Sequence, residues 1–92
     1  MPKAVIFSIE AVNDLDKILQ QIGEFTGSSA SVTKFRNGFK QKFHQIAQYP
    51  KAARLLDDGT RQSFFQRYRI IYREFDDFIL IQTIVHSLKR FP

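Results

Sequence analysis

The hydrophobic pattern of this chain changes period near its middle, and this change limits the fold more than any other sequence feature. Up to about residue 49, apolar residues recur every three or four positions, as on one face of an α-helix. From residue 61 onward, apolar and polar residues alternate, as in strands. A chain of 92 residues holds one hydrophobic core. We therefore expect one domain over residues 1–92, of the α+β class.

Two helices are predicted in the first half, after a short β-branched and aromatic strand at 4–7. The first helix ends at Gly27, and its start is ambiguous between Ser8 and Asn13 as the N-cap. The second runs over residues 28–49 and stops before Pro50. The short connection makes them an antiparallel hairpin. The apolar stripes are Ala11, Leu15, Ile18, Leu19, Ile22 and Phe25 in the first helix and Val32, Phe35, Phe39, Phe43 and Ile46 in the second.

Three strands are predicted in the second half, at 61–66, 67–75 and 78–87, after a loop at 51–59. A two-residue loop at 76–77 would pair Phe75 with Phe78. The element order is then β-α-α-β-β-β, with the N-terminal strand and an antiparallel helical hairpin packed on an antiparallel β-sheet.

Counting from that loop sorts the strand side chains onto two sides of the sheet. The side that covers the helices would pair Tyr68 with Val85, Ile70 with Thr83 and Tyr72 with Ile81. The other side would pair Arg67 with His86, Arg69 with Ile84, Ile71 with Gln82 and Arg73 with Leu80. Arginines buried without partners are costly, so we expect this second side to lie away from the helices.

This predicted basic face is enlarged by nearby cations. Lys89 and Arg90 follow the last strand, and Arg61 opens the neighbouring one. The chain carries 14 Lys and Arg against nine Asp and Glu, a formal net charge of +5, which predicts an acidic partner. The face is either a solvated polar surface or a docking surface for phosphates or carboxylates.

Aromatic content points to a contact surface as well. Ten Phe residues exceed what a small core can hold. Phe64 and Phe65 occupy opposite sides of one strand, so at least one ring should leave the helical core. That ring is either covered by the 51–60 loop or forms an apolar contact within the basic face.

Several classes of protein are excluded or disfavoured. The chain has no Cys, which excludes a disulfide scaffold, a zinc ribbon and a thiol enzyme, and favours the reducing cytoplasm. No apolar run approaches the roughly 18–20 residues that span a bilayer, and we expect no signal peptide. His44 and His86 lie on distant elements, so we predict no metal site. We also predict no cofactor, because no Gly-rich phosphate loop is present.

The order and spacing of several short motifs resemble the RelE/ParE superfamily of bacterial toxins over nearly the whole chain. The motifs are Ser8, Ala11, Asp14-Leu15 and Ile18, then Pro50, Gly59-Thr60-Arg61, the strand from Arg67 to Arg73, and His86 with Lys89. This resemblance implies a toxin of a type II toxin–antitoxin pair, neutralised by an acidic, ParD-like antitoxin that folds onto the basic domain.

RelE-type members cleave mRNA in the ribosome, and ParE-type members inhibit DNA gyrase. Arg69 and Lys89 fall where RelE-type enzymes keep basic residues, which leaves His86 as the candidate base. However, the C-terminal tyrosine of RelE-type enzymes would lie beyond Lys89, where this chain has none, and Lys51 and Arg54 replace the typical lysine pair.

The resemblance to ParE-type members is therefore the closer one, and it implies a gyrase inhibitor that is not an enzyme. Its predicted target and antitoxin contacts are Arg61, Phe64, Arg67, Arg69, Arg73, His86, Lys89 and Arg90. The alternative is a ribosome-dependent endoribonuclease using Arg69, His86 and Lys89. A third possibility is an inactive member that only sequesters antitoxins.

Overall fold

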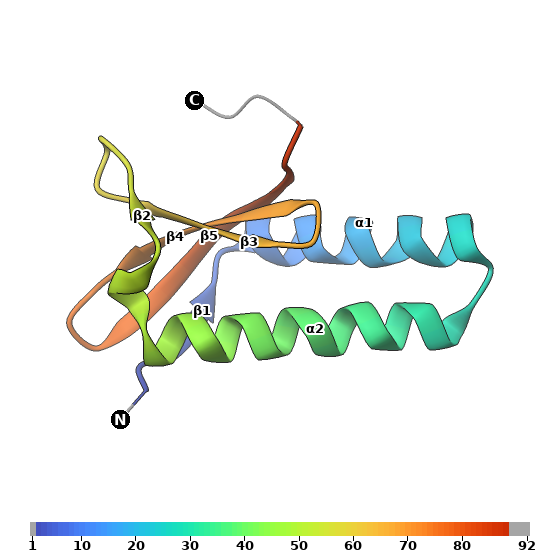
Figure 1. Ribbon diagram of the computed structural model, residues 1–92, viewed down its shortest axis with the longest axis horizontal. Helices are drawn as coiled ribbons and strands as arrows, with labels where there is room; N and C mark the ends of the chain where they lie inside the picture. The colour runs from blue at the N-terminus through green and yellow to red at the C-terminus, as the bar shows by residue number, and fades with distance from the viewer. Residues whose placement is uncertain (1, 89–92) are drawn as a thin grey trace.

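The computed structural model describes residues 2–88 and has two layers, a helical hairpin on a five-stranded sheet (Figure 1). The α+β class and the helical hairpin are confirmed. The loop at 51–59 also holds a short 3₁₀ helix and a two-residue strand. The elements are β1 (Ala4–Phe7), α1 (Ile9–Thr26), α2 (Ser29–Gln48), η1 (Pro50–Ala52), β2 (Arg54–Leu55), β3 (Arg61–Phe65), β4 (Tyr68–Glu74) and β5 (Phe78–His86).

Local capping groups set the ends of both long helices. The Ser8 hydroxyl accepts a hydrogen bond from the Ala11 backbone N–H at 3.0 Å, which fixes Ser8 as the N-cap of α1. Gly27 ends α1 in the left-handed conformation, with φ 64°. Ser28 caps α2 by accepting from the Ser31 N–H at 3.1 Å. The helix boundaries are therefore encoded by residues within one turn of each end.

The predicted apolar stripe of α1 is wrong at Phe25, its last residue. Phe25 is 92% exposed, whereas Ile18, Leu19 and Ile22 are buried. The distal end of the helical hairpin extends past the sheet (Figure 1), so Phe25 has no sheet beneath it. The apolar periodicity of α1 therefore continues for one turn beyond the part of the helix that packs against the sheet.

The strands lie in the order β1-β5-β4-β3-β2. The strand pattern predicted an antiparallel sheet, but β1 pairs in parallel with β5. The other neighbours are antiparallel, so the sheet is mixed. β5 continues beyond the end of β1, and the first turns of α1 bind the edge that this exposes. The Asp14 carboxylate accepts from the Thr83 hydroxyl at 2.6 Å and from the Ile84 N–H at 3.0 Å. These bonds satisfy edge groups that β1 cannot reach.

The predicted hairpin register is correct near the turn and wrong beyond it. Arg73 pairs with Leu80 and Tyr72 with Ile81, as counted, but the register then shifts and leaves Gln82 as an extra residue in β5. The Gln82 carbonyl accepts from the Ser8 hydroxyl at 2.7 Å. A bulge of one residue moves every later β5 side chain to the other side of the sheet. The observed pairs are Ile71 with Thr83, Ile70 with Ile84, Arg69 with Val85 and Tyr68 with His86.

The core lies between the hairpin and one side of the sheet. Phe39 is fully buried and packs against Phe65 and Tyr68, with ring centroids 4.6 and 5.8 Å apart. Burying one such large apolar side chain contributes roughly 1.5–3 kcal/mol. The buried cluster consists of Ala11, Ile18, Ile22, Phe39, Phe43, Ile46, Ile70, Tyr72, Ile79, Ile81 and Ile84.

Between residues 2 and 88, neither helix combines the length and the apolar character needed to cross a bilayer.

Candidate interaction surface on the sheet

One side of the sheet faces away from the helices, and we call it the outer face. Strand pairing defines its members, because paired residues project to the same side. Phe64 pairs with Arg69, and Arg73 pairs with Leu80, which also pairs with Ile6 of β1. Phe64 is 50% exposed and Ile6 is 47% exposed, while both arginines are partly exposed. The outer face therefore combines cationic and apolar side chains.

Arg73 is held in place by the loop between β2 and β3. Its Nη2 donates to the Asp58 carbonyl oxygen at 2.9 Å. Gly59 allows this approach with φ 87°, and a Cβ there would lie 2.8 Å from Arg73 Nη1. Hydrogen bonds from the Thr60 hydroxyl and N–H, with a smaller contribution from Arg73, lower the pKa of Asp58. Asp58 therefore stays ionised and supports the loop that orients Arg73.

Arg69 lies at the centre of the outer face. It is flanked by Phe64 on β3 and Val85 on β5, and its Nη1 donates to Gln62 Oε1 at 3.4 Å. The expectation that one ring of the Phe64-Phe65 pair leaves the core is confirmed. Phe64 lies exposed on the outer face, whereas Phe65 packs between Phe35 and Phe39.

Other predicted members do not join this face. Arg61 pairs with Tyr72 and so lies on the helical side, where its Nη1 donates to the Ala53 carbonyl at 2.9 Å. Arg67 lies in the β3–β4 turn rather than in a strand, since Gln66 adopts φ 54° just before it. Arg67 is exposed, and its carbonyl accepts from the Ser87 N–H at 2.6 Å.

His86 also lies on the helical side, because the bulge at Gln82 reverses its direction. Its ring contacts Tyr68 edge-on, with centroids 5.6 Å apart, and its Nδ1 accepts from the Leu88 N–H at 3.2 Å. Predicting it beside the arginines was therefore wrong. Lys89 and Arg90 lie outside the described residues.

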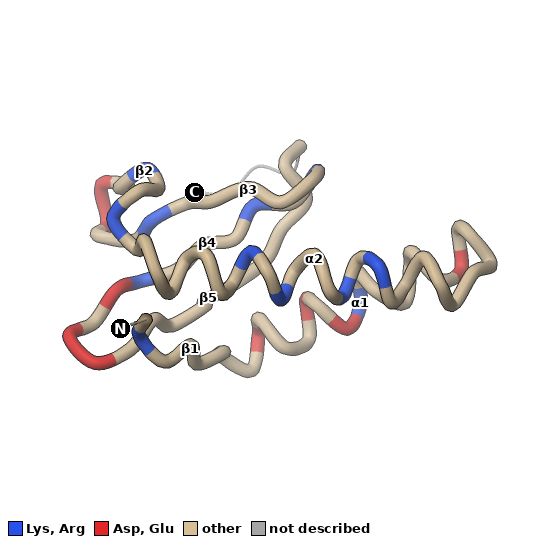
Figure 2. Tube along the Cα trace, turned by 60° about the horizontal axis from the view of Figure 1, so that its bottom comes forward, with Lys and Arg blue, Asp and Glu red and all other residues tan. Residues whose placement is uncertain are grey.

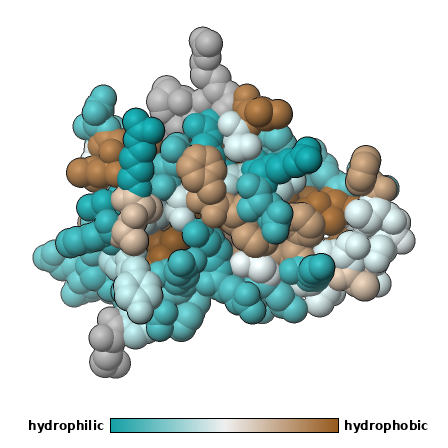
Figure 3. Space-filling model, in the orientation of Figure 1, coloured by the Kyte–Doolittle hydropathy of each residue, from teal (hydrophilic) through white to brown (hydrophobic). Residues whose placement is uncertain are grey.

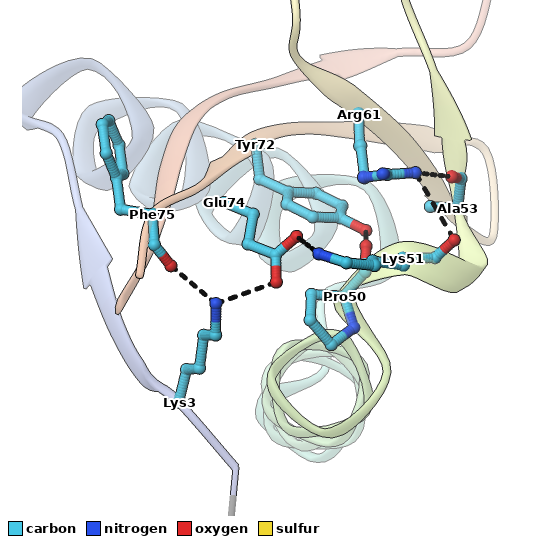
Figure 4. Close-up of polar contacts among 8 residues, drawn as sticks. All are labelled: Lys3, Pro50, Lys51, Ala53, Arg61, Tyr72, Glu74 and Phe75. Atoms are coloured by element: carbon cyan, nitrogen blue, oxygen red, sulfur yellow. Dashed lines mark hydrogen bonds and ion pairs between the residues drawn. The ribbon is translucent and has the colours of Figure 1, made fainter. Parts of the chain in front are cut away.

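Two lysines and a glutamate form a clamp that sequence reasoning missed (Figure 4). Glu74 binds Lys3 at 2.8 Å and Lys51 at 2.7 Å, and Lys3 also donates to the Phe75 carbonyl at 2.7 Å. The lysine hydrogen bonds lower the pKa of Glu74. Glu74 follows the buried Tyr72 by two residues, so strand alternation points both side chains to the same side of the sheet. This alternation is the one sequence signal that could have placed Glu74 on the helical side.

Tyr72 joins η1 to the sheet beside this clamp. Its hydroxyl donates to the Pro50 carbonyl at 2.7 Å, and burial raises its pKa (Figure 4). A surface groove of about 810 Å³ lies beside the N-terminal half of α2, against the β3–β4 turn. Phe35 and Phe65 line it together with Lys34 and Asn37.

Comparison with known proteins identifies the family. The sequence model of the ParE toxin of the type II toxin–antitoxin system parDE matches residues 5–91. The chain belongs to this family. It is a ParE-family chain within the RelE/ParE superfamily, as the motifs predicted. No curated protein matches its sequence.

Solved structures agree with the fold. The chromosomal ParDE toxin–antitoxin system from P. aeruginosa contains a chain with a TM-score of 0.80 and 18% identity, covering 91% of this chain and 95% of that one. The toxin–antitoxin complex RelBE2 from Mycobacterium tuberculosis contains a chain with a TM-score of 0.64 and 25% identity, covering 94% and 99%.

Two of the three residues that the endoribonuclease alternative would use lie on different sides of the sheet. Arg69 is on the outer face, and His86 is on the helical side of the same sheet. Lys89 lies outside the described residues.

Proposed function

We propose that this ParE-family toxin binds and inhibits DNA gyrase through the outer face. The observation that supports this most directly is the Phe64–Arg69–Arg73 arrangement. It offers two guanidinium groups and an exposed ring on one rigid sheet. Arginine and aromatic residues are the types that dominate the energetics of protein–protein contacts.

The charges of the outer face favour an acidic partner. No Asp or Glu occurs among the β3, β4 and β5 residues that project to this face between Gln62 and Val85. Arg73 is already oriented by the Asp58 carbonyl, so binding a carboxylate there costs little additional side-chain entropy. Apolar neighbours such as Leu80 and Ile6 add area that binding would bury.

The same face suits neutralisation by an acidic, ParD-like antitoxin. A disordered acidic segment that folds onto it would bury the Phe64 ring and neutralise the arginines together. The similarity to chains solved as ParDE and RelBE2 toxin–antitoxin systems supports such a partner. Expression without the antitoxin should then arrest growth, and co-expression should relieve the arrest.

A gyrase supercoiling assay with purified protein tests the proposal. Inhibition is expected at a molar excess of toxin over gyrase. It should be lost in Arg69→Gln and retained in Lys17→Gln, an exposed α1 change with the same loss of charge. Thermal melts of both variants check that folding is kept. Full supercoiling activity in the presence of excess parent protein would refute the proposal.

The second candidate is a ribosome-dependent mRNA endonuclease. The 25% identity to a chain of the RelBE2 complex and the position of Arg69 on a central strand favour it. This reading requires His86 to act as the base although it packs against Tyr68. His86→Gln should then abolish translation-dependent mRNA cuts, whereas gyrase inhibition would survive the same change.

A further inference from the structure

Helix α2 has an unusual distribution of charge. It contains Lys34, Arg36, Lys40 and Lys42 and no Asp or Glu over its whole length. In Figure 2, α2 carries only basic positions, while the neighbouring α1 carries acidic ones. Within the helical hairpin, positive charge is therefore concentrated on α2.

Three of these four cations form no polar contact within the described part of the chain. Lys34, Arg36 and Lys40 are exposed and form no ion pair or hydrogen bond with any residue between 2 and 88. Arg36 and Lys40 are four positions apart, so their like charges cost the helix about 0.2–0.5 kcal/mol. Charges that oppose helix formation and form no polar contact with the described residues fit an external, negatively charged partner.

Outside the groove that Phe35 and Phe65 line, the rest of the exposed surface of α2 is polar. Asn37 and Gln41 lie between the cations, and no large apolar side chain of α2 is exposed. In Figure 3 the surface over α2 is mainly hydrophilic. We call Arg36 and Lys40, which lie one turn apart, together with Asn37 the basic face of α2. It is separate from the outer face, because α2 packs on the opposite side of the sheet.

We propose that the basic face of α2 binds the phosphate backbone of duplex DNA. Lysine, arginine and amide side chains are the groups that contact phosphates and fix a protein on a duplex. Arg36 and Lys40 are about 6 Å apart along the helix axis, and the whole of α2 is about 30 Å long. An exposed rod of this size can lie along DNA and reach several phosphates.

Proteins, membranes and duplex RNA fit the basic face of α2 less well than duplex DNA does. A protein interface needs an apolar centre, and an interfacial membrane helix needs an apolar face. On α2 the apolar groove lined by Phe35 and Phe65 does not include Arg36 or Lys40, and no large apolar side chain is exposed beside them. The B-DNA major groove, about 12 Å wide, admits a helix, whereas the deep, narrow A-form groove of RNA does not. The inference does not depend on gyrase being the target, since it concerns direct contact with DNA.

Fluorescence anisotropy with a short labelled DNA duplex tests this inference in the absence of gyrase. The test variant carries Arg36→Gln and Lys40→Gln, which keep good helix formers in α2. The matched control carries Lys17→Gln and Arg54→Gln at other exposed positions. Each variant lowers the formal net charge by two, from +5 to +3. Thermal melts should show both variants folded.

Binding is measured between about 50 and 200 mM salt. The α2 variant should bind roughly tenfold more weakly, and its slope of log K against log salt should fall by about 2, at 0.9 per lost phosphate contact. The control should keep the parent slope. Equal losses in both variants, no binding by the parent at about 50 mM salt, or equally tight binding of an RNA duplex would overturn the inference. If the supercoiling assay showed no inhibition of gyrase, the DNA binding measured here would be unaffected.

Discussion

Replacing Glu74 with glutamine tests the clamp that joins β1 and η1 to β4. The Glu74 side chain is 14% exposed, against 27% for Lys3 and 74% for Lys51. A hydrogen bond to a charged group contributes roughly 1.5–3 kcal/mol when sheltered, whereas an exposed ion pair contributes about 0–1 kcal/mol. We therefore assign most of the effect to Lys3 and expect Glu74→Gln to lower the free energy of unfolding by about 1–2 kcal/mol.

The free energy of unfolding that Glu74→Gln removes is expected to depend on pH. The lysines lower the pKa of Glu74 in the folded state, so its contribution is present above the unfolded pKa of about 4.3 and is lost as pH falls through the folded value. Urea unfolding followed by circular dichroism at pH 7 should show the full difference between parent and variant. The difference should shrink progressively as pH is lowered below about 4.3, because a growing fraction of the parent is then protonated as well.

Tyr72→Phe provides the matched control for this experiment. It removes the hydrogen bond to the Pro50 carbonyl beside the clamp, and tyrosine does not titrate between pH 3 and 7. Its cost should be about 1 kcal/mol at both pH values. A Glu74→Gln effect that is equally large at pH 3 and 7 would refute the electrostatic account of the clamp.

Three further substitutions have distinct expected outcomes. Ser8→Ala removes the α1 cap and the donor to the Gln82 carbonyl, and should lower the free energy of unfolding by about 1–3 kcal/mol in urea titrations. Gly59→Ala should lower the melting temperature more than Gly27→Ala. Both positions have positive φ, but only a Cβ at Gly59 meets Arg73, so equal shifts would contradict the contact. Phe25→Ser should change the free energy of unfolding by no more than about 0.5 kcal/mol, because its ring is exposed; a loss above about 1 kcal/mol would contradict this.

The helical half of the fold could be predicted because its signals are local. Gly27 and the Ser28 cap act on groups within a few residues, so the ends they set can be read without knowing the tertiary structure. The α1 cap is equally local, but Ser8 and Asn13 both suit it in the sequence, and only the structure decides for Ser8. The fate of Phe25 could not be read in this way. Whether a stripe residue is buried depends on how far the sheet extends beneath the helix, which is a property of the assembled layers.

The outer face could be predicted only up to the bulge. Strand alternation correctly placed Arg69 and Arg73 away from the helices, since both lie on β4, where no residue is inserted. His86 was misplaced because the extra residue, Gln82, is stabilised by Ser8, which is 74 positions earlier in the sequence. A one-residue insertion with a distant cause leaves no periodic signal, yet it reverses every later side chain.

The pairing of β1 with β5 also constrains how the molecule is made. Residues 4–7 pair with residues 78–81, so β1 cannot join the sheet until residues 78–81 have been synthesised. The helical hairpin has mostly local contacts and can form earlier, whereas contacts so distant in sequence form slowly. A growing chain that stops short of β5 would carry a helical hairpin with an uncovered core. Any activity that needs the finished sheet would then begin only after β5 has been synthesised, which leaves an interval for a partner to be at hand.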